Sequence, residues 1–99
     1  MKADYDSEAD AILIEIEEVD HWDDGANVDD AMYCQVAFRH RRPVGVTLRY
    51  PREELHLLER AAERFDLNAL GLLATAQAAL AAPDHEVRVE VDPAVLVWR

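Results

Sequence analysis

The stretch YDSEADAILIEI, residues 5–16, decides the fold of this protein, because it joins a polar turn to a strand with alternating side chains. Ile12, Ile14 and Ile16 fall at every second position, and Glu15 stands between two of them. β-Branched residues at a period of two are typical of a strand with one buried and one wet face. MKADY, just before, predicts a short first strand that is joined to the second through the turn DSEAD.

Alternation predicts two more strands in the first half of the chain. The buried faces are expected to carry Met32, Cys34, Val36 and Phe38 of MYCQVAFR, and Val44, Val46, Leu48 and Tyr50 of VGVTLRY. Because HRRP between them is short, the two strands should form an antiparallel hairpin. The polar stretch DHWDDGANVDD, residues 20–30, is interpreted as a loop. On the wet face, Arg39 and Arg49 are expected within reach of Glu15 and Glu17.

The period changes at Pro51, which suits the first position of a helix, and Glu53 and Glu54 favour the positive end of the helix dipole. A first amphipathic helix is predicted near residues 51–65, with an apolar stripe of Leu55, Leu58, Ala62 and Phe65. Asp66 or Asn68 is expected to cap a second helix over residues 68–82. One face of this helix carries Leu67, Leu70, Leu73, Ala74, Gln77 and Ala78. The opposite face, with Leu72, Ala76, Ala79 and Leu80, is almost as apolar, so burial on more than one side is expected.

After Pro83, the alternating stretch EVRVEV predicts a strand over residues 86–91, and PAVLVWR predicts one more short strand carrying Trp98. The sequence therefore predicts an α+β fold: an antiparallel β-sheet of about five strands with two α-helices packed on one face. The 99 residues suffice for a single domain, 1–99, with a β-rich part (1–50), two helices (51–82) and a C-terminal strand segment (83–99).

Composition excludes several classes of function. The formal charge of −11 argues against sequence-independent binding of nucleic acid, which needs Lys and Arg to neutralise phosphates. One cysteine, Cys34, can form neither an internal disulfide nor a zinc ligand set. MKADYDSEAD lacks the apolar core of a signal peptide, and no apolar run is long enough to span a membrane. We expect a cytoplasmic protein that binds neither nucleic acid nor membrane.

The first half of the chain resembles the small bacterial family DUF2283. The resemblance is carried by Tyr5, Asp6, Glu8, Ala9, Asp10, Ala11 and Ile14, and by Arg42, Val44, Gly45 and Val46. It covers residues 1–50; HRRP replaces the family's usual Asp-Gly turn, and residues 51–99 have no counterpart in the minimal family domain. The resemblance implies a small β-sheet domain without an established activity, some of whose relatives accompany toxin-like proteins.

The acidic triplet Asp6, Glu8 and Asp10 has the spacing that begins a calcium loop. However, Ala11 stands where such a loop needs glycine, and Glu17, at the twelfth position by count, lies inside a predicted strand. The preferred interpretation is a turn in which Asp side chains bond backbone N–H groups. A cation site remains the alternative.

The sequence offers two further candidate sites. His21 with Asp23 and Asp24 could ligate a transition metal, although such loop groups are more often solvated. Cys34 could be a nucleophile, but it shares the apolar face of its strand and is predicted to be buried and inert. Nothing in the sequence brings His40, His56 and His85 together.

Two surfaces are candidates for binding. RHRR, residues 39–42, could contact an anionic ligand or RNA, or could be a solvated hairpin tip that deters edge pairing. The second helix is apolar almost all round, and Gly71, Ala74 and Ala78 would let another helix approach closely. A homodimer through residues 68–82 is therefore expected, with burial inside the chain as the alternative.

These observations lead us to expect a non-catalytic protein-binding module whose partner is a basic protein. An antitoxin that binds a basic toxin would be one example of such a module. The alternative is a metal-binding protein or small enzyme that uses the N-terminal acidic turn or the His21 loop. No catalytic, cofactor-binding or metal residue is assigned, because no triad, paired carboxylate or phosphate-binding loop is recognisable.

Overall fold

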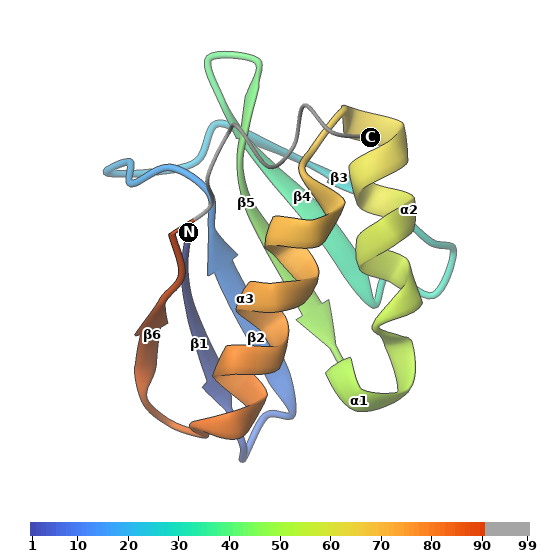
Figure 1. The fold of residues 1–99 in the computed structure, drawn as a ribbon. Helices are drawn as coiled ribbons and strands as arrows, with labels where there is room; N and C mark the ends of the chain where they lie inside the picture. Colours follow the sequence, from blue (N-terminus) through green and yellow to red (C-terminus); the bar gives the residue numbers. More distant parts are fainter. Residues whose placement is uncertain (91–99) are drawn as a thin grey trace.

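Six antiparallel strands form one open sheet in the order β3-β4-β5-β2-β1-β6, and the helices cover one of its faces (Figure 1). The structure is a computed structural model and describes residues 1–90. The strands are β1 (Lys2–Asp6), β2 (Ala11–Glu15), β3 (Asp24–Asn27), β4 (Cys34–Arg39), β5 (Arg42–Arg49) and β6 (Glu86–Arg88). The helices are α1 (Pro51–Glu54), α2 (His56–Phe65) and α3 (Ala69–Ala81). The predicted α+β class is confirmed, with six strands where about five were expected.

The register of the central strands places one continuous apolar layer under the helices. Ile12 lies opposite Leu48 on β5 and opposite Tyr5 on β1. Ile14 lies opposite Val46 in the same way. Ile12, Ile14, Val46 and Leu48 are all fully buried. The opening stretch therefore supplies the middle of the core, as its alternation predicts.

The two long helices divide the sheet between them. α3 packs against β1 and β2, and α2 packs against β4 and β5. Their buried faces carry Leu57, Leu58, Ala61 and Ala62 on α2, and Gly71, Leu72, Thr75, Ala76 and Ala79 on α3. Small side chains predominate on α3, so its backbone can lie close to the sheet.

The transition from sheet to helix is sharper than predicted. Tyr50 adopts a left-handed conformation with φ 53°, which turns the chain directly from β5 into α1 at Pro51. A break at Leu55 then separates α1 from α2 within the predicted first helix. Of the two predicted caps for the second helix, Asn68 is the one used: its side chain accepts the Gly71 N–H at 3.0 Å. Asp66, at φ 56°, ends α2 instead.

The loop predicted over residues 20–30 is wrong in part, because it contains β3. Its sequence, DGAN, has no β-branched or aromatic residue and carries no recognisable strand signal. The strand forms because β4 provides a partner, with Gly25 opposite Ala37 and Ala26 opposite Val36. Tertiary pairing therefore overrides local preference here.

Two predicted core residues are exposed. Met32 is 56% exposed and Tyr50 is 40% exposed. Both have left-handed φ angles, and both lie just outside the strands to which alternation assigned them. Alternation holds only while the backbone stays extended, so it failed at these ends.

The structure decides which face of the second helix is buried, a choice that the sequence left open. Leu70 is 50% exposed, and Ala74 and Gln77 are also exposed, whereas Leu72 is fully buried. The sequence could not decide between the faces because leucine and alanine lie on all sides of the helix. At the end of the chain, β6 confirms a strand within 86–91, while Val91 and the strand predicted around Trp98 lie outside the described residues.

Candidate functional site

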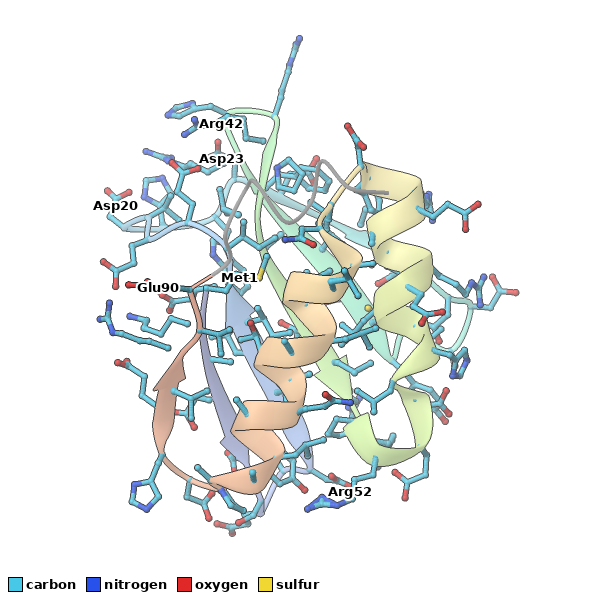
Figure 2. All side chains as sticks on the ribbon, in the orientation of Figure 1. Met1, Asp20, Asp23, Arg42, Arg52 and Glu90 are labelled. Carbon is cyan, nitrogen blue, oxygen red and sulfur yellow. The ribbon has the colours of Figure 1, made fainter. Side chains whose placement is uncertain are left out.

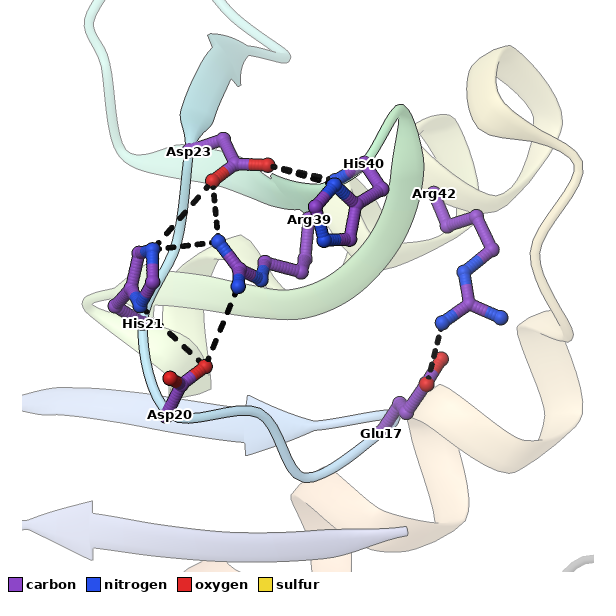
Figure 3. A network of polar contacts seen from close by, with 7 residues as sticks. All are labelled: Glu17, Asp20, His21, Asp23, Arg39, His40 and Arg42. Atoms are coloured by element: carbon purple, nitrogen blue, oxygen red, sulfur yellow. Dashed lines mark hydrogen bonds and ion pairs between the residues drawn. The ribbon is translucent and has the colours of Figure 1, made fainter.

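The segment between β2 and β3 crosses the ends of β5 and β4, and polar contacts fasten it to the β4–β5 hairpin (Figure 3). Arg39, at the end of β4, is the centre of these contacts. Its guanidinium donates to Asp23 Oδ1 at 2.7 Å, lies 3.6 Å from an Asp20 oxygen and also contacts His21 Nε2. We call this group of Asp20, His21, Asp23 and Arg39 the crossing clamp.

Asp23 also holds the hairpin turn. Its second carboxylate oxygen accepts the backbone N–H of His40 at 2.7 Å. His40 and Arg41 form a two-residue loop between paired Arg39 and Arg42, and their φ angles are 51° and 66°. A type I′ turn requires positive φ at both positions, usually at Asn or Gly. The two hydrogen bonds lower the pKa of Asp23, with the His40 bond as the larger cause.

The basic cluster RHRR is engaged mainly within the chain. Arg42 donates to Glu17 Oε1 at 2.7 Å, and Arg39 belongs to the crossing clamp. Arg41 forms no ion pair with any residue in the described part of the chain. The expected pairs of Arg39 and Arg49 with Glu15 and Glu17 do not form: Glu17 pairs with Arg42, and Glu15 pairs with Lys2. The segment between β2 and β3, here called the crossing segment, carries Glu17 to Arg42 and carries Asp20 and Asp23 to Arg39. The sequence does not predict its course.

The structure separates the residues of the predicted His21 metal site. Asp24 accepts the N–H of Gly25 at 2.8 Å and forms no ion pair with the crossing clamp within residues 1–90. His21 and Asp23 remain close at 3.8 Å, but the Arg39 cation contacts both. Within residues 1–90, no group of three or more His, Cys, Asp or Glu side chains is placed to hold a metal ion. The arrangement is that of an ion-pair network on a connecting segment.

The acidic turn between β1 and β2 has internal hydrogen-bond partners for two of its three carboxylates. Asp6 Oδ1 accepts the N–H groups of Glu8 at 3.0 Å and Ala9 at 3.1 Å. Asp10 accepts the hydroxyl of buried Tyr5 at 2.7 Å and has a left-handed φ of 53°. This hydrogen bond is the main cause of a raised Tyr5 pKa. The geometry fits the predicted structural turn.

A second contact of this turn has no counterpart in the sequence prediction. Ser7 donates its N–H and its hydroxyl to the carboxylate of Asp84, at 2.9 and 2.6 Å. These bonds lower the pKa of Asp84. Ser7 and Asp84 are far apart in sequence, and only the pairing of β6 with β1 brings them together. No local sequence signal could have identified this contact.

Cys34 is fully buried, as predicted from its place on the apolar face. Burial raises the pKa of its thiol to about 12. Its Sγ lies 3.9 Å from the Leu57 carbonyl, under α2. A thiol with these properties is protonated and shielded at neutral pH.

Lys2 is surrounded by more carboxylates than it can neutralise. Its Nζ lies 2.8 Å from Glu18, 3.1 Å from Glu15 and 3.6 Å from Glu86. Hydrogen bonds to Glu18 and Glu15 raise its pKa, and the bond from Lys2 lowers the pKa of Glu18. Arg88 shares Glu18 and Glu86. The sequence could not predict this cluster, because it depends on the β1–β6 and β1–β2 registers together.

The exposed side of α3 is apolar. Leu70, Ala74, Gln77 and Ala81 are exposed on it, and α3 contains no charged residue. The small residues singled out from the sequence are divided: Gly71 is buried within the chain, Ala74 is exposed, and Ala78 lies between. Only part of the predicted close-packing surface is therefore available to another molecule.

Comparisons with known proteins leave the family open: no family model, no curated protein and no solved structure matches the chain. The resemblance to DUF2283 stays a prediction. None of the helices among residues 1–90 has the length and apolar character needed to cross a membrane.

Proposed function

We propose that this protein is a non-catalytic binding module whose partner is a basic protein. The observation that carries the proposal is the distribution of charge. Residues 1–31 contain twelve of the twenty-one acidic side chains and only one of the ten basic ones, so the remainder of the chain is neutral. The structure folds these residues into β1, β2, the crossing segment and β3, so the acidic side chains extend across the sheet, and Arg39, Arg42 and Arg88 from the rest of the chain neutralise only some of them.

A net charge of −11 favours recognition of an oppositely charged protein. It raises the rate of encounter with a basic partner and repels nucleic acid and other acidic proteins. Catalysis would need titratable groups of perturbed pKa near one another in a site. Here Cys34 is shielded, and the His21, Asp23 and Arg39 side chains bind one another. These features support binding over reaction.

The proposal includes self-association through the exposed side of α3. Leu70 and Ala74 offer an uncharged surface, and Ala74 would allow a second helix to approach closely. A copy of the same chain is the partner that such a surface suits, because both helices would lose apolar area from water. Ala74→Glu should then convert a dimer into a folded monomer in size-exclusion chromatography with light scattering. His56→Glu, which adds an acid to α2, should leave the mass unchanged.

The proposed setting is the cytoplasm, where the single thiol would stay reduced. An antitoxin-like protein, which neutralises a basic toxin by covering it, is one form of this function. The experiment is affinity capture of the full chain from its native cytoplasm, followed by association kinetics with the purified partner. We expect a basic protein whose association slows as salt rises from low to physiological concentration. Recovery of the chain alone, or association insensitive to salt, contradicts the proposal.

A further inference from the structure

Trp22 lies on the face of the sheet that the helices leave open. A side chain at Gly45 would point to this face, and its Cβ would lie 3.3 Å from Trp22 Cζ2 and 3.7 Å from Cε2. The indole therefore rests directly on the backbone of β5. About half of it stays accessible, since Trp22 is 46% exposed.

The register of the sheet makes room for this indole. Gly25, Ala37 and Gly45 are successive partners across β3, β4 and β5, and together they form a strip almost without side chains. Ala37 is only 5% exposed, although it lies on the open face. The crossing segment that carries Trp22 thus covers part of the strip. The crossing clamp fixes this segment through Asp23, the residue after Trp22.

The charges around Trp22 are predominantly negative. Glu15 is the partner of Gly45 on the neighbouring strand and shares Lys2 with Glu18 and Glu86. On the other side, Asp20 and Asp23 share Arg39. Arg88 also contacts Glu18 and Glu86, so three cations (Lys2, Arg39 and Arg88) face five carboxylates, and this face keeps an excess of negative charge. Figure 2 shows Asp20 and Asp23 near one end of the molecule, well away from Arg52 at the other.

We propose that the open face around Trp22 docks a Lys- or Arg-rich segment of the partner, with Trp22 as the central anchor. This inference rests on the proposed function and names the surface that performs it. A cationic side chain stacked on the indole would gain a cation–π contact, and its neighbours would reach the carboxylates around Lys2 and Arg39. Half-exposed Trp residues are frequent hot spots of protein interfaces.

Charge decides between the occupants that this face could accept. A second copy of the chain would bring two negative faces together, and a nucleic acid would bring phosphates to carboxylates. Both arrangements are repulsive. Leu13, half-buried on the next row of the same face, offers apolar contact to the aliphatic part of Lys or Arg. A Lys- or Arg-rich segment is therefore the occupant that fits both the negative charge of this face and the apolar surface of Leu13.

The test is a selection from a displayed library of random 12-residue peptides with the full chain as target. We expect the enriched peptides to be rich in Lys and Arg, and to bind Trp22→Ala at least about tenfold more weakly. Leu13→Ser serves as a second variant on the same face. Met32→Ala is the matched control, because Met32 is an exposed apolar residue (56%) that lies before the start of β4, at the other end of this strand from Arg39 and the crossing clamp. It should leave the affinity unchanged.

Fluorescence supplies an independent reading. In a Trp98→Phe background, the emission of Trp22 should change when a selected peptide is added. Basic peptides that bind the Trp22→Ala and Leu13→Ser variants as well as the wild type would overturn the location and leave the proposed function standing. Neutral or acidic consensus peptides, or no enrichment at all, would overturn both. Circular dichroism of each variant confirms that the fold is retained; if Trp22→Ala unfolds, Leu13→Ser alone decides.

Discussion

The carboxylate of Asp23 accepts the backbone N–H of His40 at 2.7 Å, and so a residue before β3 holds the turn between β4 and β5. The same carboxylate accepts Arg39 at 2.7 Å. The contact stabilises a turn whose two central residues have positive φ although neither is glycine. It also fixes the end of the crossing segment next to Trp22.

Replacing Asp23 by Ala should lower the melting temperature by several degrees, because the turn loses its acceptor and Arg39 loses its main partner. The control is Asp24→Ala, which removes a neighbouring acid whose one hydrogen bond among residues 1–90 is to the N–H of Gly25. Thermal unfolding followed by circular dichroism measures both. Equal melting temperatures for the two variants would show that the Asp23 contacts contribute nothing specific.

Acid should loosen the same region first. The pKa of Asp23 is lowered in the folded protein, so its contribution to stability is present above the unfolded value of 3.8 and is lost as pH falls through the lower folded value. The pKa of Asp84 is lowered too, and the same sign applies to its bonds with Ser7. The protection factors of the His40 and Ser7 amides, which compare hydrogen exchange with its intrinsic rate at the same pH, should therefore fall below about pH 3.8. Asp23→Asn should flatten this dependence at His40 and leave it intact at Ser7.

Cys34 should not react in the native protein. With its pKa raised to about 12 and its side chain buried, it is protonated at pH 8 and inaccessible. A thiol reagent such as dithionitrobenzoate should label it only as the protein unfolds in urea. Rapid labelling without urea would contradict the buried position under α2.

Asp10→Ala should reduce the free energy of unfolding by about 1–2 kcal/mol, because Tyr5 loses its hydrogen-bond partner and alanine tolerates positive φ less well. Asp10→Asn should lose less, since asparagine keeps an acceptor and adopts this conformation readily. Glu8→Ala is the control, because no described residue bonds the Glu8 carboxylate. Urea denaturation gives the three values. A rise in melting temperature with sub-millimolar calcium or magnesium would instead favour a cation site.

Alanine substitutions of Leu72 and Leu70 test which face of α3 packs on the sheet. Leu72→Ala should cost about 2–5 kcal/mol of unfolding free energy, because it leaves a cavity in the core. Leu70→Ala should cost no more than about 0.5 kcal/mol in the monomer, because Leu70 is exposed. Urea denaturation at low protein concentration measures both. The reverse order would mean that the face carrying Leu70 is the one that packs on the sheet.

Much of the fold was predictable because its main elements carry strong local patterns. Ile12, Ile14 and Ile16 recur at every second position, Pro51 begins a helical segment, and Cys34 shares the apolar face of its strand. The weak points were the places where local pattern is absent or ambiguous. DGAN shows no strand preference, and α3 is apolar on all sides, so only contact with β4 and with β1 and β2 decided pairing and rotation.

The candidate site was less predictable for a related reason. The sequence by itself determined the net charge, the buried thiol and the turn-forming role of the N-terminal acids, since these depend on residue type and on neighbours a few positions away. Only the tertiary structure decided that the basic hairpin residues meet Glu17, Asp20 and Asp23, that Ser7 meets Asp84, and that Trp22 rests on Gly45. Each of these contacts joins residues that are distant in sequence, and the order of the strands in the sheet decides whether they meet. That order depends on the packing of the complete apolar layer, which no local stretch of sequence specifies.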